Sequence, residues 1–303
     1  MLSSMSRNSS VALALATVYL VWGSTYLAIR VGVRDLPPFL FSGSRFMAAG
    51  LLMLLWARSR GHRLPQRWQD WRSIAFAALT MLVAGNGLVT WSEQWVESNQ
   101  AALIVATSAL WIAWFGTFGS RGETVNRLSI VGLAVGFAGV AVLVGGGLQL
   151  RAAPPLAYAA LLAATVAWGA GSVALRRHPP ACSAWVGAAL QMMIAGAVMG
   201  SIGMASGEAP RWHMTPTAAW MLLYLTVFGS CIAYGAYFWL VQQVTPAVLG
   251  TYAYVNPAVA VVLGWAILDE RLSPTQWLGT LVILGGVVLV TLASRKPKPA
   301  SPA

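Results

Sequence analysis

The side chains best able to do chemistry are a few polar groups inside long apolar stretches. Arg45 lies in one such stretch, and Asn86, Thr90 and Glu93 follow in another at spacings that place them on one helical face. A polar group surrounded by hydrocarbon is costly, so these residues are the first candidates for a solute or ion pathway. We expect Arg45 and Glu93 to line a common outer vestibule or to form an ion pair, and a pair that only fixes two helices is the structural alternative.

A second set of candidates is aromatic or weakly polar. The phrase WGSTYLAIR at 22–30 returns as WGAGSVALR at 168–176, and the Trp of each copy is central in its apolar stretch. A central Trp either lines a cavity or packs, whereas an interfacial Trp belongs to the membrane belt. The substrate-binding candidates in this set are Tyr19, Trp22, Tyr26, Thr107, Trp111, Trp168, Ser172, Gln191, Tyr234, Tyr237, Tyr252, Tyr254 and Asn256.

The elements that must position these residues are membrane-spanning helices. Hydrophobic residues make up 58% of the 303 positions and charged residues 9%, against about 25% charged in a typical soluble domain. A spanning helix needs about 20 apolar residues. Ten segments meet this requirement, at 11–33, 38–58, 71–92, 99–119, 127–147, 154–175, 182–205, 217–241, 246–268 and 274–293.

The repeat extends through both halves of the chain. FMAAGLLM at 46–53 aligns with MMIAGAVM at 192–199, and VGLAVGFAGVAVL at 131–143 aligns with LGTLVILGGVVLV at 278–290. Five spans separate the copies, so the second copy is upside down relative to the first, as in many secondary transporters. We predict an all-α polytopic membrane protein of ten transmembrane helices, built as two inverted five-helix repeats at 1–149 and 150–293, with a disordered cytoplasmic tail at 294–303.

The repeat offset also relates individual candidates. It places Arg45 opposite Gln191, which predicts polar groups at equivalent positions in the two halves. Asn256 directly precedes Pro257, so its amide either faces a substrate or satisfies backbone groups that the proline frees.

The positive charges lie in the loops. A net charge of +11 would suggest a nucleic-acid partner in a soluble protein, but here one side of the predicted membrane collects thirteen cationic residues and the other five. The positive-inside rule therefore places both termini in the cytoplasm, and no nucleic-acid partner is expected. The thirteen are Arg7, Arg58, Arg60, Arg63, Arg67, Arg72, Arg121, Arg127, Arg176, Arg177, Arg295, Lys296 and Lys298.

Other function classes lack their signatures. His62, His178 and His213 are scattered over separate loops, and Cys182 and Cys231 have no metal-ligand or disulfide spacing, so neither a metal site nor an embedded enzyme is expected. A phosphate-binding loop for an ATP-driven pump is absent from the sequence. No cofactor is predicted, and the loops are too short to form the docking domains of a scaffold protein.

The chain resembles the EamA branch of the drug/metabolite transporter superfamily. The resemblance rests on WGSTYLAIR, GSRFMAAG at 43–50, the second WG, YAYVNPAVAVVLGWAILDERLS at 252–273 and the Gly-rich fifth and tenth spans. It implies a bacterial inner-membrane exporter of metabolites. One departure is ATSALW at 106–111, where Ala109 stands at a position that is often proline in the family, so a kink is not expected there, whereas Pro257 keeps one plausible in the second half.

These observations together predict a secondary transporter that exports a small organic metabolite, an amino acid or a related compound, by alternating access. A multidrug or organic-ion exporter and an uncoupled facilitator are the alternatives, because Glu93 is the one plausible proton carrier in the spans. The glycines of spans five and ten, among them Gly132, Gly139 and Gly286, predict close helix packing, either inside one molecule or between two. A monomer or a homodimer fits this pattern, with the lipid bilayer and a small-molecule substrate as partners.

Overall fold

The computed structural model describes residues 7–96, 98–118, 126–145, 153–268 and 274–295, and these form a helical bundle without strands. Shorter apolar helices cover Ile104–Gly116, Arg127–Gly139 and Trp277–Val290. Six helical runs are long and apolar enough to cross a membrane: Arg7–Gly32, Pro38–Ser59, Trp68–Ser92, Pro155–Arg177, Ala184–Ala205 and Pro216–Leu240. The count of ten spans stays a prediction, and the predicted tail lies outside the described residues from residue 296 onward.

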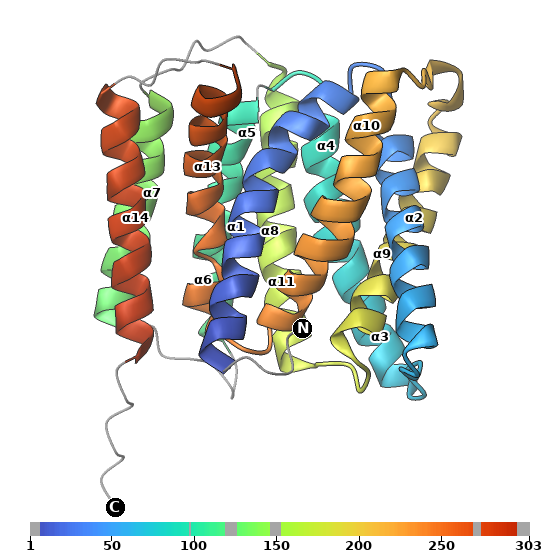
Figure 1. Ribbon diagram of the computed structural model, residues 1–303, viewed down its shortest axis with the longest axis horizontal. Helices are drawn as coiled ribbons and strands as arrows, with labels where there is room; N and C mark the ends of the chain where they lie inside the picture. Colours follow the sequence, from blue (N-terminus) through green and yellow to red (C-terminus); the bar gives the residue numbers. More distant parts are fainter. Residues whose placement is uncertain (1–6, 97, 119–125, 146–152, 269–273, 296–303) are drawn as a thin grey trace, which may run out of the picture.

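The helices stand side by side, and α1 begins and α14 ends at the same end of the bundle, the lower end in Figure 1. The elements of the first half are α1 (Arg7–Gly32), α2 (Pro38–Ser59), α3 (Trp68–Ala77), η2 (Ala78–Gly87), α4 (Leu88–Ser92), α5 (Ser98–Ala106), α6 (Ser108–Gly116) and α7 (Arg127–Gly145). Those of the second half are α8 (Pro155–Arg177), α9 (Ala184–Ala205), η3 (Ala209–Arg211), α10 (Pro216–Tyr224), η4 (Leu225–Tyr234), α11 (Gly235–Leu240), α12 (Pro246–Leu249), α13 (Tyr252–Leu268) and α14 (Pro274–Arg295).

Local sequence explains where several helices begin and end. Thr215 and Thr245 each precede a proline at the first helical position, and their hydroxyls accept hydrogen bonds from main-chain N–H groups three residues later. Gly61 and Gly207 follow the ends of α2 and α9 with φ of 79° and 72°. A side chain is strained in that region, so glycine stops each helix.

Two π-helical segments interrupt otherwise α-helical runs. In η2 and η4 the backbone widens over ten residues, at 78–87 and 225–234, and the two segments are 147 residues apart. Such segments are rare in proteins and often occur at functional sites. The spacing of the two π segments thus agrees with the offset of the sequence repeat.

Two of the predicted spans are discontinuous helices. The fourth is divided at Thr107 into α5 and α6, although it lacks the proline that would predict a break. The ninth is divided at Gly250 and Thr251 into α12 and α13, whereas α13 continues through Pro257. The break of this span therefore precedes the proline, and a kink at Pro257 stays a prediction.

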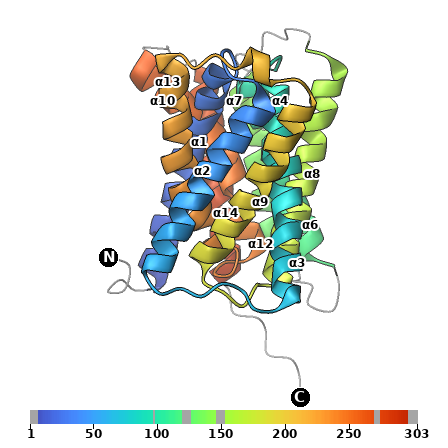
Figure 2. The ribbon, with the colours of Figure 1, turned by 90° about the vertical axis from the view of Figure 1, so that its right-hand side faces the viewer.

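Glycines allow two pairs of helices to touch backbone to backbone. The α2–α9 and α7–α14 pairs make the most extensive helix contacts and form opposite ends of the bundle (Figures 1 and 2). A Cβ on Gly43 would lie 2.7 Å from the main-chain nitrogen of Gly200, and one on Gly286 would lie 2.6 Å from that of Gly136. The glycines of the fifth and tenth spans therefore form an internal contact.

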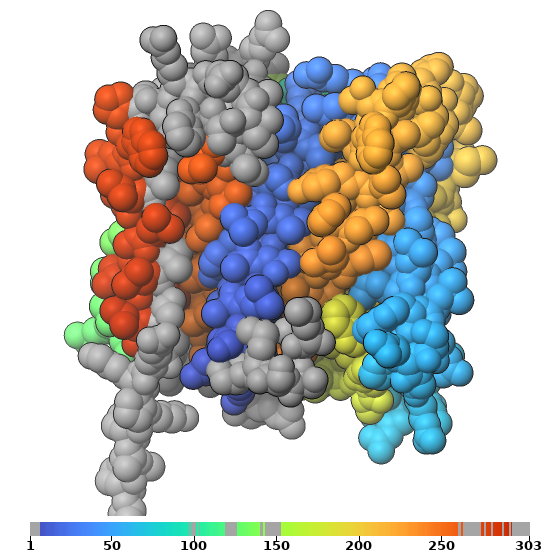
Figure 3. All heavy atoms as spheres, viewed as in Figure 1, coloured from blue at the N-terminus to red at the C-terminus, as the bar shows by residue number. Residues whose placement is uncertain are grey.

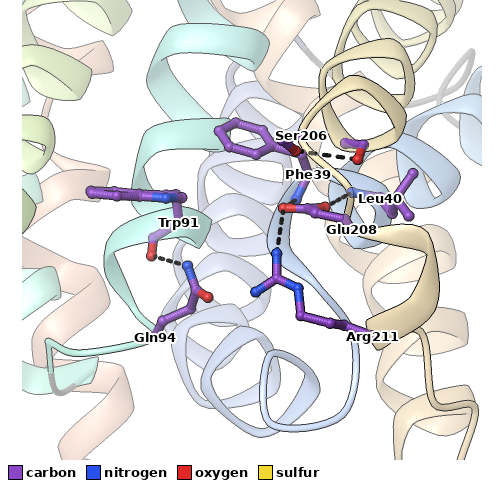
Figure 4. Close-up of polar contacts among 8 residues, drawn as sticks. Phe39, Leu40, Trp91, Gln94, Ser206, Glu208 and Arg211 are labelled. Atoms are coloured by element: carbon purple, nitrogen blue, oxygen red, sulfur yellow. Dashed lines mark hydrogen bonds and ion pairs between the residues drawn. The ribbon is translucent and has the colours of Figure 1, made fainter.

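A buried carboxylate ties α9 to the start of α2. Glu208 accepts hydrogen bonds from the main-chain N–H groups of Leu40, at 2.8 Å, and Phe39, at 3.4 Å (Figure 4). Arg211 lies 3.9 Å from the same carboxylate. Glu208 thus supplies, from the connection between α9 and η3, the negative charge that the N-terminus of α2 lacks in its own first turn.

Candidate functional site

A cavity lies in the middle of the bundle, between helices of both halves. Its volume is about 70 Å³. A space of this size holds a few water molecules, so a solute has to push side chains apart. The cavity is lined by Trp22, Thr25, Tyr26, Ile29, Arg45, Phe46, Leu82, Gly85, Asn86, Val89, Val105, Ser108, Ala164, Thr165, Trp168, Gly229, Tyr234, Tyr252 and Asn256.

Arg45 brings a positive charge to this cavity from α2. Its side chain is 4% exposed, its Nε donates to Ser230 Oγ at 2.8 Å, and its guanidinium lies 4.7 Å from the centre of the Phe46 ring. A Cβ on Gly229 would lie 3.0 Å from the guanidinium, so the glycine leaves room for it. Arg45 forms no ion pair with any residue that the structure describes, and the buried charge is left to attract an anionic group.

An aromatic cluster closes one side of the cavity. The ring centre of Trp22 lies 5.5 Å from that of Trp168, 5.0 Å from that of Tyr237 and 5.1 Å from that of Tyr252. The Tyr237 hydroxyl accepts a hydrogen bond from Trp168 Nε1 at 3.1 Å and is 2.8 Å from Ser172 Oγ. Each half contributes a Trp to this cluster, and π-faces of this kind suit apolar or cationic parts of a ligand.

Two asparagines add neutral polar groups. Asn86 lines the cavity, and its Oδ1 is buried without a hydrogen-bond partner among the described residues. The Asn256 side-chain nitrogen, in the amide orientation that satisfies both of its polar atoms, donates to the main-chain oxygens of Tyr252, at 3.0 Å, and Tyr19, at 3.3 Å. Asn256 therefore joins α13 to α1, whereas Asn86 keeps a free acceptor.

The expected pair between Arg45 and Glu93 does not form. Glu93 is fully buried, does not line the cavity, and neither of its carboxylate oxygens has a hydrogen-bond partner in the described part of the chain. The nearby cation is Arg30, whose guanidinium donates to the main-chain oxygen of Glu93. The prediction of an ion pair was wrong because Arg45 turns toward η4 and its serine instead.

Other candidates lie behind the cavity wall. Thr90 bonds to the main-chain oxygen of Asn86. Tyr19 bonds to Thr251, Gln191 accepts from Tyr234, and Ser172 bonds to Tyr237. Tyr254 is buried and packs against Gly136, while Thr107 and Trp111 line a separate recess with Leu110, Trp114 and Leu162.

Several lining residues escaped the sequence argument. Thr25 and Ile29 continue the helical face of Trp22, so face continuity could have found them. Ser108 directly follows the break at Thr107, and its Oγ lies 3.5 Å from the Tyr252 hydroxyl. This contact depends on the break, which no residue in the sequence predicts. The remaining lining residues are apolar side chains or glycines, and nothing in their residue type distinguishes them from the other apolar residues of the spans.

Comparison with known proteins finds relatives over nearly the whole chain. The model of the EamA-like transporter family matches residues 9–145 and 155–292. The chain is 40% identical over 282 residues to a protein of Escherichia coli K12 named as the uncharacterized inner membrane transporter YedA, covering 92% of this chain and 90% of that protein. It is 26% identical to the uncharacterized transporter YoaV of Bacillus subtilis, covering 95% and 99% of the two chains.

A solved crystal structure shares the fold. It is 22% identical in sequence, superposes with a TM-score of 0.78, and the match covers 96% of this chain and 100% of the other. At this level of identity the likeness shows the common architecture alone.

Proposed function

Because the chain belongs to the EamA-like transporter family, we propose that it exports a small amphipathic organic acid, such as an amino acid, across the inner membrane by alternating access. The family and the helical runs that can span a membrane make the protein a membrane transporter. The solute class, the direction and the mechanism are our proposal, and they rest on the central cavity.

The unpaired guanidinium of Arg45 carries this proposal. A charge removed from water without a counter-charge is costly, and a substrate carboxylate would supply one through charge-assisted hydrogen bonds. The free Oδ1 of Asn86 offers an acceptor for an ammonium or amide group. A donor and an acceptor in one cavity suit a zwitterion.

The aromatic cluster supports an amphipathic rather than a purely polar solute. Trp22, Trp168, Tyr234 and Tyr252 line the cavity with ring surface. Sites for small organic ligands are mostly apolar, with a few polar groups that fix orientation. The solute would place its carboxylate toward Arg45 and its apolar part toward the tryptophans.

Equivalent helix contacts in the two halves support the proposal of alternating access. The helix contacts occur in equivalent pairs: α1 packs on α13 and η4, while α8 packs on α5, α6 and η2. The π segments, the glycine helix ends and the two family matches keep nearly the same offset. We propose inverted five-helix repeats that rock along the glycine contacts of α2–α9 and α7–α14.

Coupling to protons would use Glu93. A carboxylate without hydrogen-bond donors is costly to bury, so a change of access that opens its surroundings to water would favour proton exchange. The other buried carboxylates described, Asp70 and Glu208, each accept hydrogen bonds from main-chain N–H groups and have structural roles. We propose that both termini are cytoplasmic, an orientation supported by the basic residues in the loops at the end of the bundle where α1 begins.

The test is solute flux in proteoliposomes, measured with a panel of amphipathic amino acids, their carboxamides and organic cations. We expect transport of the acids, weaker transport of the carboxamides, and a loss of about ten- to a hundredfold in kcat/KM for Arg45→Gln, the equivalent of one charged hydrogen bond. Arg58→Gln, which removes an exposed arginine from the same helix, is the matched control. Equal transport of acids and carboxamides, or full activity of Arg45→Gln, would refute the carboxylate site and favour a multidrug exporter.

A further inference from the structure

A second and larger hollow lies at the end of the bundle where α1 begins, between α1, α2, α9 and α11. Its volume is about 700 Å³, and its lining is almost wholly apolar. Figure 3 shows α1 and α2 on one face, with the helical run that begins at α10 between them. We call this hollow the α1–α2 groove.

The groove opens sideways, to the surroundings of the bundle. Leu13 of α1, Leu52 and Trp56 of α2, and Ile232 of η4 line it, and their side chains are 44% to 54% exposed. In a membrane these residues face hydrocarbon rather than water. An apolar hollow at this depth is filled by an apolar chain, because water finds few polar partners there.

Two arginines flank the end of the groove. Arg7 lies one helical turn before Ser10, which lines the groove, and its guanidinium reaches the main-chain oxygen of Gln243 at 3.4 Å, beyond the end of α11. Arg60 ends α2, and its guanidinium lies 5.9 Å from the ring centre of Trp56. Both arginines are exposed, whereas Asp70, an acidic residue at this end, is buried and bonded to Ala181.

We infer that the α1–α2 groove binds one anionic phospholipid, with an acyl chain in the hollow and its phosphate near the arginines that flank the end of the groove. Basic residues beside an apolar recess at the cytoplasmic membrane surface have the chemistry that selects an anionic headgroup. The tryptophans of the groove, Trp56 and Trp185, pack edge to face with ring centres 5.2 Å apart. Such rings prefer the boundary between headgroups and acyl chains.

The groove is lined on one side by η4, the segment whose Ser230 accepts a hydrogen bond from Arg45. Cys231 and Gly235 of η4 and α11 line the groove, while Ser230 of η4 bonds to Arg45. A bound lipid would therefore press on one face of η4 while the solute occupies the other.

The test is lipid retention by the purified full-length chain, measured by native mass spectrometry with equal amounts of dioleoyl phosphatidylglycerol and dioleoyl phosphatidylcholine. We expect one phosphatidylglycerol per chain to be retained preferentially, and at least a fivefold loss of that preference in the double variant Arg7→Gln with Arg60→Gln. The matched control, Arg67→Gln with Arg72→Gln, removes two exposed arginines from the same end of the bundle. If both double variants lose the preference equally, surface charge alone attracts the lipid and the inference is wrong.

A second variant tests the acyl chain. Ala14 lines the groove and Leu20 lies on the exposed face of the same helix, so Ala14→Phe fills the hollow and Leu20→Phe does not. We expect retention to fall severalfold in Ala14→Phe alone, at an unchanged unfolding temperature of the delipidated protein. Unchanged retention in Ala14→Phe would overturn the inference. These measurements involve no solute flux, so their failure would leave the proposed transport function standing.

Discussion

Arg45 and Gln191 occupy equivalent positions of the two halves, 146 residues apart on α2 and α9, yet they face different surroundings. Arg45 lines the central cavity and bonds to Ser230 of η4. Gln191 is fully buried behind that cavity, where its Oε1 accepts a hydrogen bond from Tyr234 of the same segment. The π segment η4 therefore bonds to both residues, through the hydroxyls of Ser230 and Tyr234, four positions apart.

The difference teaches that a symmetric scaffold can hold an asymmetric site. The repeat relates the positions at which polar groups enter the bundle, but the neighbouring helix decides whether a side chain lines the cavity or lies behind its wall. The first half supplies the charged side chain, Arg45. The second half supplies the hydroxyls of Ser230 and Tyr234, which bond to Arg45 and to Gln191. Changes at these four residues can break or sharpen the comparison.

Gln191→Arg makes the two positions alike and should have the largest effect. Gln191 has no cavity to face, so a guanidinium there would be buried without a counter-charge, at a cost of about 3–5 kcal/mol. We expect a severe loss of folded protein, measured as the unfolding temperature in detergent. Gln191→Met, of similar volume and without charge, is the control, and a stable Gln191→Arg chain would show that the halves are interchangeable at this position.

Ser230→Ala removes the hydroxyl that positions Arg45. A buried charged donor then loses its partner, which costs about 2 kcal/mol, and the guanidinium is free to turn away from the solute. The expected result is a rise of severalfold or more in KM for the transported acid, with kcat less affected. Ser44→Ala on α2, whose hydroxyl bonds only to the Phe41 main-chain oxygen among described groups, should leave KM unchanged.

Tyr234→Phe removes the corresponding hydroxyl from Gln191. Both polar atoms of that amide would then lack partners, because its Nε2 already has none among the described residues. We expect a loss of about 1 kcal/mol of stability, smaller than for a charged group, measured by thermal unfolding. The double variant Tyr234→Phe with Gln191→Met should recover most of it, and an additive further loss would contradict this pairing.

Glu93→Gln tests the coupling and should change stability least. The amide has nearly the shape of the carboxyl group and cannot titrate, so flux should lose its dependence on a pH gradient while transport down the solute gradient remains. Flux measured at several imposed gradients in proteoliposomes provides the readout. An unchanged pH dependence would exclude Glu93 as the proton carrier and leave an uncoupled facilitator.

Much of the architecture could be predicted because apolar length and repeat register are properties of the sequence itself. The second predicted span, 38–58, coincides with α2 to within one residue, and the resemblance to the EamA family is confirmed by the family match. The break at Thr107 could not be predicted, since no proline stands there and the cause lies in tertiary packing. The glycine contacts were predicted, but their partners became clear only from the fold.

The site was predicted where a residue's polarity and its orientation agree. Trp22, Trp168, Arg45 and Asn86 all line the cavity. Gln191 was predicted to line the cavity because of its repeat offset from Arg45. The offset gives the position of a residue along its helix, but it does not reveal the Tyr234 hydroxyl that bonds to the Gln191 side chain. Glu93 illustrates the same limit, because it lies just past the end of α4 and outside the cavity that Asn86 and Val89 line.

The two π segments also indicate that the two halves of the chain have a common origin. A wide helical turn at the same register in both halves is inherited most simply from one ancestral half-length gene, in which it already existed before that gene was copied and fused. The breaks at Thr107 and at Gly250 interrupt the fourth and ninth spans, which the repeat pairs, so both halves have a broken helix in the corresponding span. The widened turns and the broken helices are then features that the two halves share through their common origin.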